Sequence, residues 1–332
     1  MSEKGRILIR NTEKSSIGYI VKEAFHIFLE PTNTMDSCFI IKPNLGFRTG
    51  AKGGTTSTDI IKAILKEIRD NYRPRNIYLV ESDGLAFRCE EVFEYLGLDK
   101  VCSEFGAEFI NISKAPTVKV KNNSMNILNI FDMPAVFMED NTRLINLPKI
   151  KTHEVTGYSG AIKNLYGLNP YVFKVKYHPV IALVLQDLYN IFKPDLTIVD
   201  GIWAIDGHGP WTGEPINLNL IISGDDALHT DMECLKIIGR EAEDIPYLEN
   251  MYKSQGATDY SVTGDTYQPR NFQWQPMSGF GKFKERMARL LVPLFEKGIP
   301  LFYYSRGSFK LIIYGRKGKY CKSIFVFPKQ KD

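Results

Sequence analysis

Short apolar runs rich in β-branched residues alternate along the chain with longer segments whose apolar residues recur at helical spacing. This alternation is typical of strand, helix and strand crossover units, so we expect an α/β fold with mostly parallel sheets. The expected strands are 6–9, 38–42, 77–80, 108–112, 143–147, 196–199 and 219–222. The expected helices are 17–28, 58–72, 90–105, 179–192, 227–238 and 245–252.

A change of composition near residue 268 divides the chain. We expect an α/β core over 1–267, with two lobes around a cleft and their boundary near 115–145, and a basic, aromatic extension over 268–332. Residues 280–332 hold 13 Lys and Arg against three Asp and Glu, although the whole chain carries only +4. A helical pattern at 283–294 opens this part. An anionic partner, either a membrane surface or a nucleic acid, is one reading of 280–332, and a core-packing helix with solvated lysines is the other.

The beginning of the chain is charged and has no apolar stretch of the kind found in a secretory signal, so a cytoplasmic location is expected. No window approaches the roughly 20 apolar residues of a membrane span. The five cysteines are widely spaced and form no CxxC pair, which favours inert buried thiols and predicts no intrinsic iron–sulfur cluster. They are Cys38, Cys89, Cys102, Cys234 and Cys321.

Ligands of open α/β sheets gather beyond the carboxyl ends of the strands, so polar residues at strand ends are candidates for chemistry. One such group precedes the helix expected at 58–72 and offers an anion cradle. Its members are Lys42, Asn44, Thr56 and Ser57. Glu81 and Asp83 follow the strand at 77–80 and are a candidate acid/base pair, with ordinary turn residues as the alternative.

The strongest candidate site is the stretch from Asn146 to Asn169. Glycines let backbone amides approach an anion closely, lysine supplies a charge or a nucleophilic amine, and histidine supplies a metal ligand or a proton carrier. A glycine-rich connection with solvated lysines is the alternative. The candidate residues here are Lys151, His153, Gly160, Lys163 and Asn164.

A second group lies in the sequence DGIWAIDGHGP. Asp200, Asp206 and His208 have the spacing to bind a divalent ion or to orient a substrate hydroxyl, or they are turn residues of a tight loop. His178 and His153 join Asp200 and Asp206 as candidate metal ligands.

Four pieces of this sequence resemble the family catalogued as domain of unknown function 362. They are IIKPNLG with TTSTDIIKAIL, INLPKIKTH with GAIKNLYGLNP, IVDGIWAIDGHGPWTGEP, and SGDDALHTDMECLKIIG, in the family's order over about residues 38–265. Many relatives carry a ferredoxin-like module with clustered cysteines, which is missing here. The resemblance therefore implies an external ferredoxin or flavin as a redox partner.

A fainter likeness is to lactate racemase, in the segment HEVTGYSGAIK. In that family a lysine tethers a nickel pincer nucleotide and a histidine reaches the nickel, which takes hydride from a 2-hydroxy acid. The likeness implies Lys163 as the tether, His178 as the metal ligand and His153 as a site histidine. That family's Gly-x-His turn reads SDGLAF here, so Asp83, Glu81 or His208 would act as the base.

We therefore expect an enzyme of the isomerase or oxidoreductase class that acts on a small anionic or hydroxylated substrate, with a divalent metal or nucleotide-derived cofactor. The first alternative is a redox accessory protein that works with an external ferredoxin or flavin partner. The second is peripheral binding to a membrane or nucleic acid through the basic tail. The substrate and the oligomeric state stay open.

Overall fold

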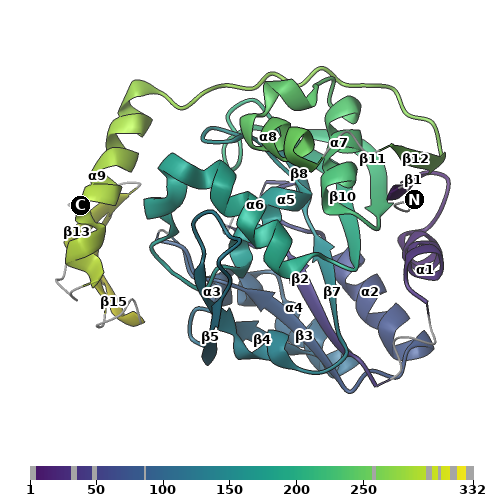
Figure 1. Cartoon of the computed structure of the whole chain (residues 1–332), viewed down its shortest axis with the longest axis horizontal. Coiled ribbons are helices and arrows are strands. Elements are labelled where there is room, and N and C mark those ends of the chain that lie inside the picture. Colours follow the sequence, from purple (N-terminus) through teal and green to yellow (C-terminus); the bar gives the residue numbers. More distant parts are fainter. Residues whose placement is uncertain are drawn as a thin grey trace, which may run out of the picture.

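A ten-stranded sheet runs through the middle of the molecule (Figure 1). The computed structural model describes residues 5–30, 36–46, 51–85, 87–255, 259–296, 301–305, 308–314 and 320–326. The strands of the sheet are β1 (Gly5–Asn11), β2 (Cys38–Pro43), β3 (Asn76–Glu81), β4 (Glu108–Asn111), β7 (Thr142–Leu147), β8 (Lys149–His153), β9 (Gly157–Ser159), β10 (Leu196–Asp206), β11 (Glu214–Gly224) and β12 (Tyr260–Gly264).

The strand order is β12, β1, β11, β10, β7, β2, β3, β4, with β8 and β9 branching from β10. Neighbours from β10 through β7, β2 and β3 to β4 are parallel, whereas β11 runs antiparallel to both β1 and β10. The expected α/β fold with a mostly parallel sheet is therefore confirmed. The carboxyl ends of β2, β3 and β7 meet at one edge, which is where a ligand is expected.

Helices cover both faces of the sheet because successive side chains of a buried strand point to opposite sides. In β2, Phe39 and Ile41 pack on one cluster and Ile40 packs on the other. The first face is covered by α1 (Ile17–Phe28), α2 (Thr58–Asn71), α3 (Cys89–Tyr95) and α4 (Leu98–Phe105). The second is covered by α5 (Ala161–Asn164), α6 (Ile181–Phe192), α7 (Ala227–Ile237) and α8 (Pro246–Gln255).

Two elements differ from their sequence-based prediction. The helix expected at 90–105 is split, because Gly97 has a left-handed φ of 67° that ends α3 before α4 begins. Much of the loop expected at 200–215 belongs to long paired strands, since β10 and β11 pair as far as Asp206 and Glu214, with a register shift between Gly201 and Trp203. Asp200 and Asp206 therefore lie on a strand and not in a tight loop.

A boundary between two lobes was expected near 115–145. The strands that precede and follow this segment, however, belong to the same sheet. That segment forms a separate hairpin of β5 (Thr117–Lys121) and β6 (Ile130–Pro134), followed by the 3₁₀ helix η2 (Ala135–Met138). The chain then returns to the same sheet as β7, next to β2. The division into two lobes stays a prediction.

Beyond the core, an extended segment leads to α9 (Gly279–Glu296), which stands at the side of the molecule (Figure 1). A small antiparallel sheet follows, formed by β13 (Leu301–Ser305), β14 (Ser308–Tyr314) and β15 (Tyr320–Val326). None of the helices in the described ranges is long and apolar enough to span a bilayer. Four of the cysteines, Cys38, Cys89, Cys102 and Cys234, are free and buried, and the side chain of Cys321 lies outside the described residues.

Candidate functional site

An ion pair between Lys42 and Glu81 lies at the carboxyl ends of β2 and β3. The distance from Lys42 Nζ to Glu81 Oε2 is 2.7 Å, and the two residues are only 1% and 3% exposed. Lys42 also donates to the carbonyl of Pro43, and Glu81 accepts from the backbone N–H groups of Leu45 and Ser82. Because the hydrogen bonds surround both charges, the desolvation cost of burying the pair is offset and its position is fixed.

A chain of amide side chains joins three elements beside this ion pair. Lys151 of β8 donates to Asn44 Oδ1 at 2.7 Å and to the Gly54 carbonyl at 2.6 Å. Asn44 donates to Asn164 Oδ1 at 3.1 Å, and Asn164 donates to Asn146 Oδ1 at 2.8 Å. The structure thus brings together Lys42, Asn44, Lys151 and Asn164, which the sequence placed in two separate candidate groups.

The short helix α5, which carries Lys163, begins on a buried carboxylate. Asp231 of α7 accepts hydrogen bonds from the N–H groups of Ala161 (2.6 Å) and Ile162 (2.8 Å) and from the Tyr158 hydroxyl (3.0 Å). A Cβ at Gly160 would lie 2.1 Å from Asp231 Oδ1. Gly160 is therefore required for this close approach within the protein, and its predicted contact with a cofactor stays a prediction.

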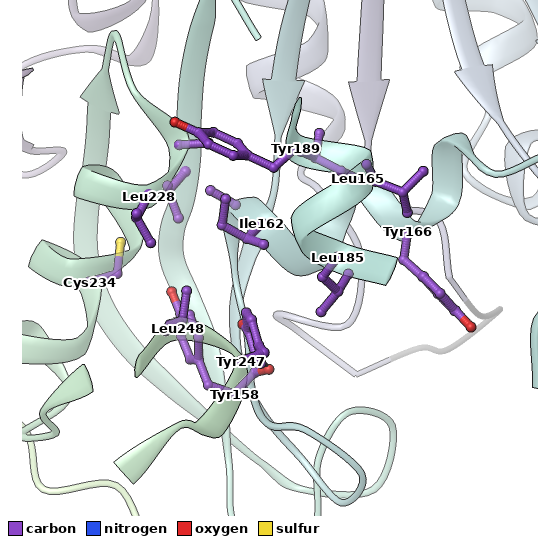
Figure 2. Close-up of a cluster of buried hydrophobic side chains, with 14 of the residues drawn as sticks. Tyr158, Ile162, Leu165, Tyr166, Leu185, Tyr189, Leu228, Cys234, Tyr247 and Leu248 are labelled. Atoms are coloured by element: carbon purple, nitrogen blue, oxygen red, sulfur yellow. The ribbon is translucent and has the colours of Figure 1, made fainter. Parts of the chain in front are cut away.

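The apolar side of α5 faces the core, and Lys163 lies on the same short helix. Figure 2 shows Ile162 and Leu165 among buried side chains of the helices that cover this face, including Leu185 and Leu228. Their burial anchors α5 and the following 3₁₀ helix η3 (Leu165–Leu168). The position of Lys163 is consequently set by packing and by the Asp231 cap.

The amine of Lys163 lies 4.8 Å from the ring centre of Tyr166. Within the described residues no hydrogen-bond acceptor reaches it. Burial and the nearby charge of Lys42 lower the pKa of Lys163 to about 8, against an opposing effect of Glu81. Burial and the charges of Lys149 and Lys163 lower the pKa of Lys151 to about 7. Two lysines that are partly uncharged near neutral pH therefore lie close together.

His153, at the end of β8, lies within electrostatic reach of these lysines. Its Nδ1 accepts a hydrogen bond from the Val155 N–H at 3.1 Å, so the neutral ring carries its hydrogen on Nε2. The pKa of His153 is held well below its usual value by burial and then by the charges of Lys163, His178 and Lys151. A neutral imidazole is thus placed beside the two lysines.

His178 lies on the 3₁₀ helix η4 (Lys174–Val180) and is held in place by a residue of the C-terminal extension. Its Nδ1 is 3.2 Å from Oε1 of Glu285 on α9, and this hydrogen bond is the main reason that the pKa of Glu285 is lowered. The charges of His178 and of the exposed His208 act to lower the pKa of Glu154. Burial and the charge of Glu285 outweigh them and raise the pKa of Glu154.

Two predicted site residues hold the backbone in place. Asp83 Oδ1 accepts from the Cys89 N–H at 3.0 Å and from Asn111 at 3.2 Å, so this carboxyl group caps α3. The Thr56 hydroxyl receives the Asn44 N–H and donates to the Leu147 carbonyl. These contacts use the Thr56 hydroxyl and Asp83 Oδ1, whereas Asp83 Oδ2 is buried without a hydrogen-bond partner among the described residues.

The two aspartates proposed as metal ligands are also occupied within the protein. Asp200 forms a buried ion pair with Lys149 at 2.8 Å, and its second oxygen accepts the Ser57 N–H at 2.7 Å. Asp206 Oδ1 accepts the N–H groups of Gly207 and Gln273. In the part of the chain that the structure describes, no three His, Cys, Asp or Glu side chains are grouped to hold a metal ion. Metal binding by His153 and His178 stays a prediction.

Sequence reasoning missed four charged residues around this edge. They are Glu154, Lys174, Asp231 and Glu285. Lys174 Nζ donates to Ser82 Oγ at 2.8 Å and to the Asp83 carbonyl at 2.7 Å, and burial lowers its pKa to about 8. The sequence places each far from its partner, so only the three-dimensional fold reveals them.

Residues 40–236 match the family described as domain of unknown function (DUF362). The chain belongs to this family. The matched range contains Lys42, Lys151 and Lys163 but ends before α9, so Glu285 lies outside it. The chain is also similar to the thylakoid-associated protein sll1697 of Synechocystis sp., with 31% identity over 110 residues. That match covers 31% of this chain and 34% of the Synechocystis protein.

Proposed function

We propose that this DUF362 protein is an enzyme that binds a small anionic or hydroxylated substrate beside Lys163 and acts on it through the Lys163 amine. One observation carries the proposal. Lys42 and Lys149 are each paired with a carboxylate, whereas Lys151 and Lys163 have no carboxylate partner among the described residues. Lys151 is buried and Lys163 is half-buried, and ammonium groups in such places are unfavourable without a counter-ion, so an anion that enters this site is attracted to both.

The proposed roles follow from the charges of the groups. With a pKa of about 8, Lys163 is present in part as a free amine near neutral pH and serves as a nucleophile or a base. Lys151 supplies positive charge for the anionic group. Neutral His153 donates a hydrogen bond from Nε2, and His178 is oriented by Glu285.

Pulsed acylation with acetic anhydride tests this assignment. Modification of Lys163, followed by peptide mass mapping, should rise with pH around a midpoint of about 8. The exposed Lys62 serves as the reference. Inorganic phosphate or lactate should protect Lys163, because a bound anion raises its pKa. The proposal fails if the acylation of Lys163 has the same pH dependence as that of Lys62. It also fails if neither phosphate nor lactate protects Lys163.

A form of the proposal that resembles lactate racemase adds a nucleotide-derived cofactor attached to Lys163. Native mass spectrometry with elemental analysis of anaerobically purified protein tests it directly. An added mass that maps to Lys163 and is lost in Lys163→Ala supports attachment. If the measured mass equals that of the polypeptide alone, the cofactor-bearing form of the proposal is ruled out. Anion binding is then decided by the acylation experiment.

A further inference from the structure

The helix α9 has two faces with different surroundings. Its inner face is attached to the core: Val292 packs with Phe173, Glu285 meets His178, and Glu296 accepts a hydrogen bond from the hydroxyl of Tyr171. These contacts account for the helix being held beside η4. The opposite face of α9 is exposed to solvent.

The outer face carries three large apolar side chains. Phe283, Met287 and Leu290 are 59%, 38% and 62% exposed. Their spacing of four and then three residues puts them on one side of an α-helix, since the helix has 3.6 residues per turn. Other exposed apolar residues, such as Tyr19 and Ile130, lie on separate elements. We call Phe283, Met287 and Leu290 the α9 stripe.

Positive charge borders the stripe. Lys282 and Arg286 are exposed and lie one turn apart, and Arg286 is a neighbour of both Phe283 and Leu290 on the helix surface. Within α9 itself there are four basic residues and two acidic ones, so the helix carries a net positive charge. An apolar stripe flanked by positive charge complements a bilayer surface, which has an apolar interior beneath anionic headgroups.

We propose that α9 docks on the surface of an anionic lipid bilayer, lying in the interface with the α9 stripe inserted and Lys282 and Arg286 at the phosphate groups. Two other occupants fit less well. A second copy of the chain would bring the same positive charges together. A nucleic acid would use the bases, but it would leave aliphatic Met287 and Leu290 without a role.

Sedimentation of the full-length chain with lipid vesicles tests the proposal. The protein should sediment with vesicles of phosphatidylcholine and phosphatidylglycerol, and far less with phosphatidylcholine alone. Binding should weaken as salt is added, because the bases at the surface are screened. The triple variant Phe283→Ser, Met287→Ser, Leu290→Ser should lower the partition coefficient by about tenfold or more, since it removes most of the inserted apolar area.

A matched control separates the α9 stripe from apolar surface in general. The variant Tyr19→Ser, Ile130→Ser, Val262→Ser removes three exposed apolar side chains from other elements and should bind as the unmodified chain does. The variant Lys282→Gln, Arg286→Gln should lose the preference for anionic vesicles. Lys163→Met should leave vesicle binding unchanged, so this proposal stands or falls separately from the proposed function.

Three results would overturn the inference. One is a chain that sediments with neither kind of vesicle. Another is a triple stripe variant that binds anionic vesicles as strongly as the unmodified chain. The third is a dimer in sedimentation equilibrium that the stripe variant abolishes, because the stripe would then be an interface between copies.

Discussion

The carboxylate of Asp231 and the backbone N–H of Ala161 lie 2.6 Å apart, although the two residues are 70 positions apart in the chain. This hydrogen bond sets where α5 begins, two residues before Lys163. The same carboxylate also receives the Ile162 N–H and the Tyr158 hydroxyl. A side chain of α7 thus determines the position of the amine to which we assign the chemistry.

Replacing Asp231 by alanine should lower the free energy of unfolding by about 3 kcal/mol, because three buried donors lose their acceptor. Urea unfolding followed by circular dichroism measures this difference. Asp132→Ala breaks an exposed ion pair with Lys119 and should cost less than about 1 kcal/mol. Equal effects of the two substitutions would contradict the role given to Asp231.

A methyl group at Gly167 should disturb the ion pair between Lys42 and Glu81. A Cβ there would lie 2.4 Å from Glu81 Oε1 and 2.6 Å from Lys42 Cε, and neither buried side chain has room to move. Gly167→Ala should therefore cost about 2 kcal/mol in thermal or urea unfolding. Gly18→Ala, in α1 with no atom within 4 Å of the new Cβ, should stabilise by about 0.5–1 kcal/mol.

Stability should depend on pH in two windows. The pKa of Asp231 is raised from 3.8 to about 7 by burial, so its stabilising contribution is lost as the pH rises through about 7. Lys151 and Lys163 have pKa values lowered from 10.5 to about 7 and about 8. The folded state then binds fewer protons than the unfolded state, so stability rises toward pH 10.5 and is lost as the pH falls through these values.

Unfolding midpoints in urea between about pH 7 and about pH 10 check the upper window. Lys163→Met should show a weaker rise in stability over this range than the unmodified chain. Lys62→Met, at an exposed position, should keep the full rise. A Lys163→Met profile parallel to the unmodified one would show that this amine titrates at its ordinary value.

Removing the carboxylate that holds His178 should loosen α9. In Glu285→Ala, hydrogen–deuterium exchange of residues 279–296 should become severalfold faster, because fewer contacts then oppose opening of the helix. Glu249→Ala removes a surface partner of Lys253 on α8 and serves as the control. Unchanged exchange in α9 would mean that Val292 and Glu296 suffice to hold it.

The regular elements could be predicted from the sequence where apolar spacing was clear. The helix expected at 17–28 is observed with those bounds, and the strand expected at 38–42 lies within β2. The split at Gly97 could not be predicted, because a glycine inside a helical pattern either continues or ends the helix. The length of β10 and β11 was hidden by Asp200, Gly201 and Asp206, which are typical turn residues but are paired across the hairpin.

The sequence predicted which residues belong to the candidate site, but not how they are arranged. Lys42, Lys151 and Lys163 were each named, yet their arrangement depends on β2, β8 and α5 meeting at one sheet edge. The roles of Asp83 and Asp200 as a helix cap and an ion-pair partner could not be separated from chemistry in the sequence, since both uses require a carboxylate at a strand end. Glu285 lies more than 100 residues from His178, and no local pattern links the two.

The place of β1 in the sheet affects how the protein is made. Among the strands that the structure describes, β1 pairs only with β11 and β12, whose residues lie at 214–224 and 260–264. During synthesis β1 therefore has no sheet partner until β11 has left the ribosome. Ile7, Leu8 and Ile9 are buried in the folded protein, so until β11 arrives these apolar side chains lack their packing partners and a chaperone that shields short apolar strands would have its longest opportunity to bind there.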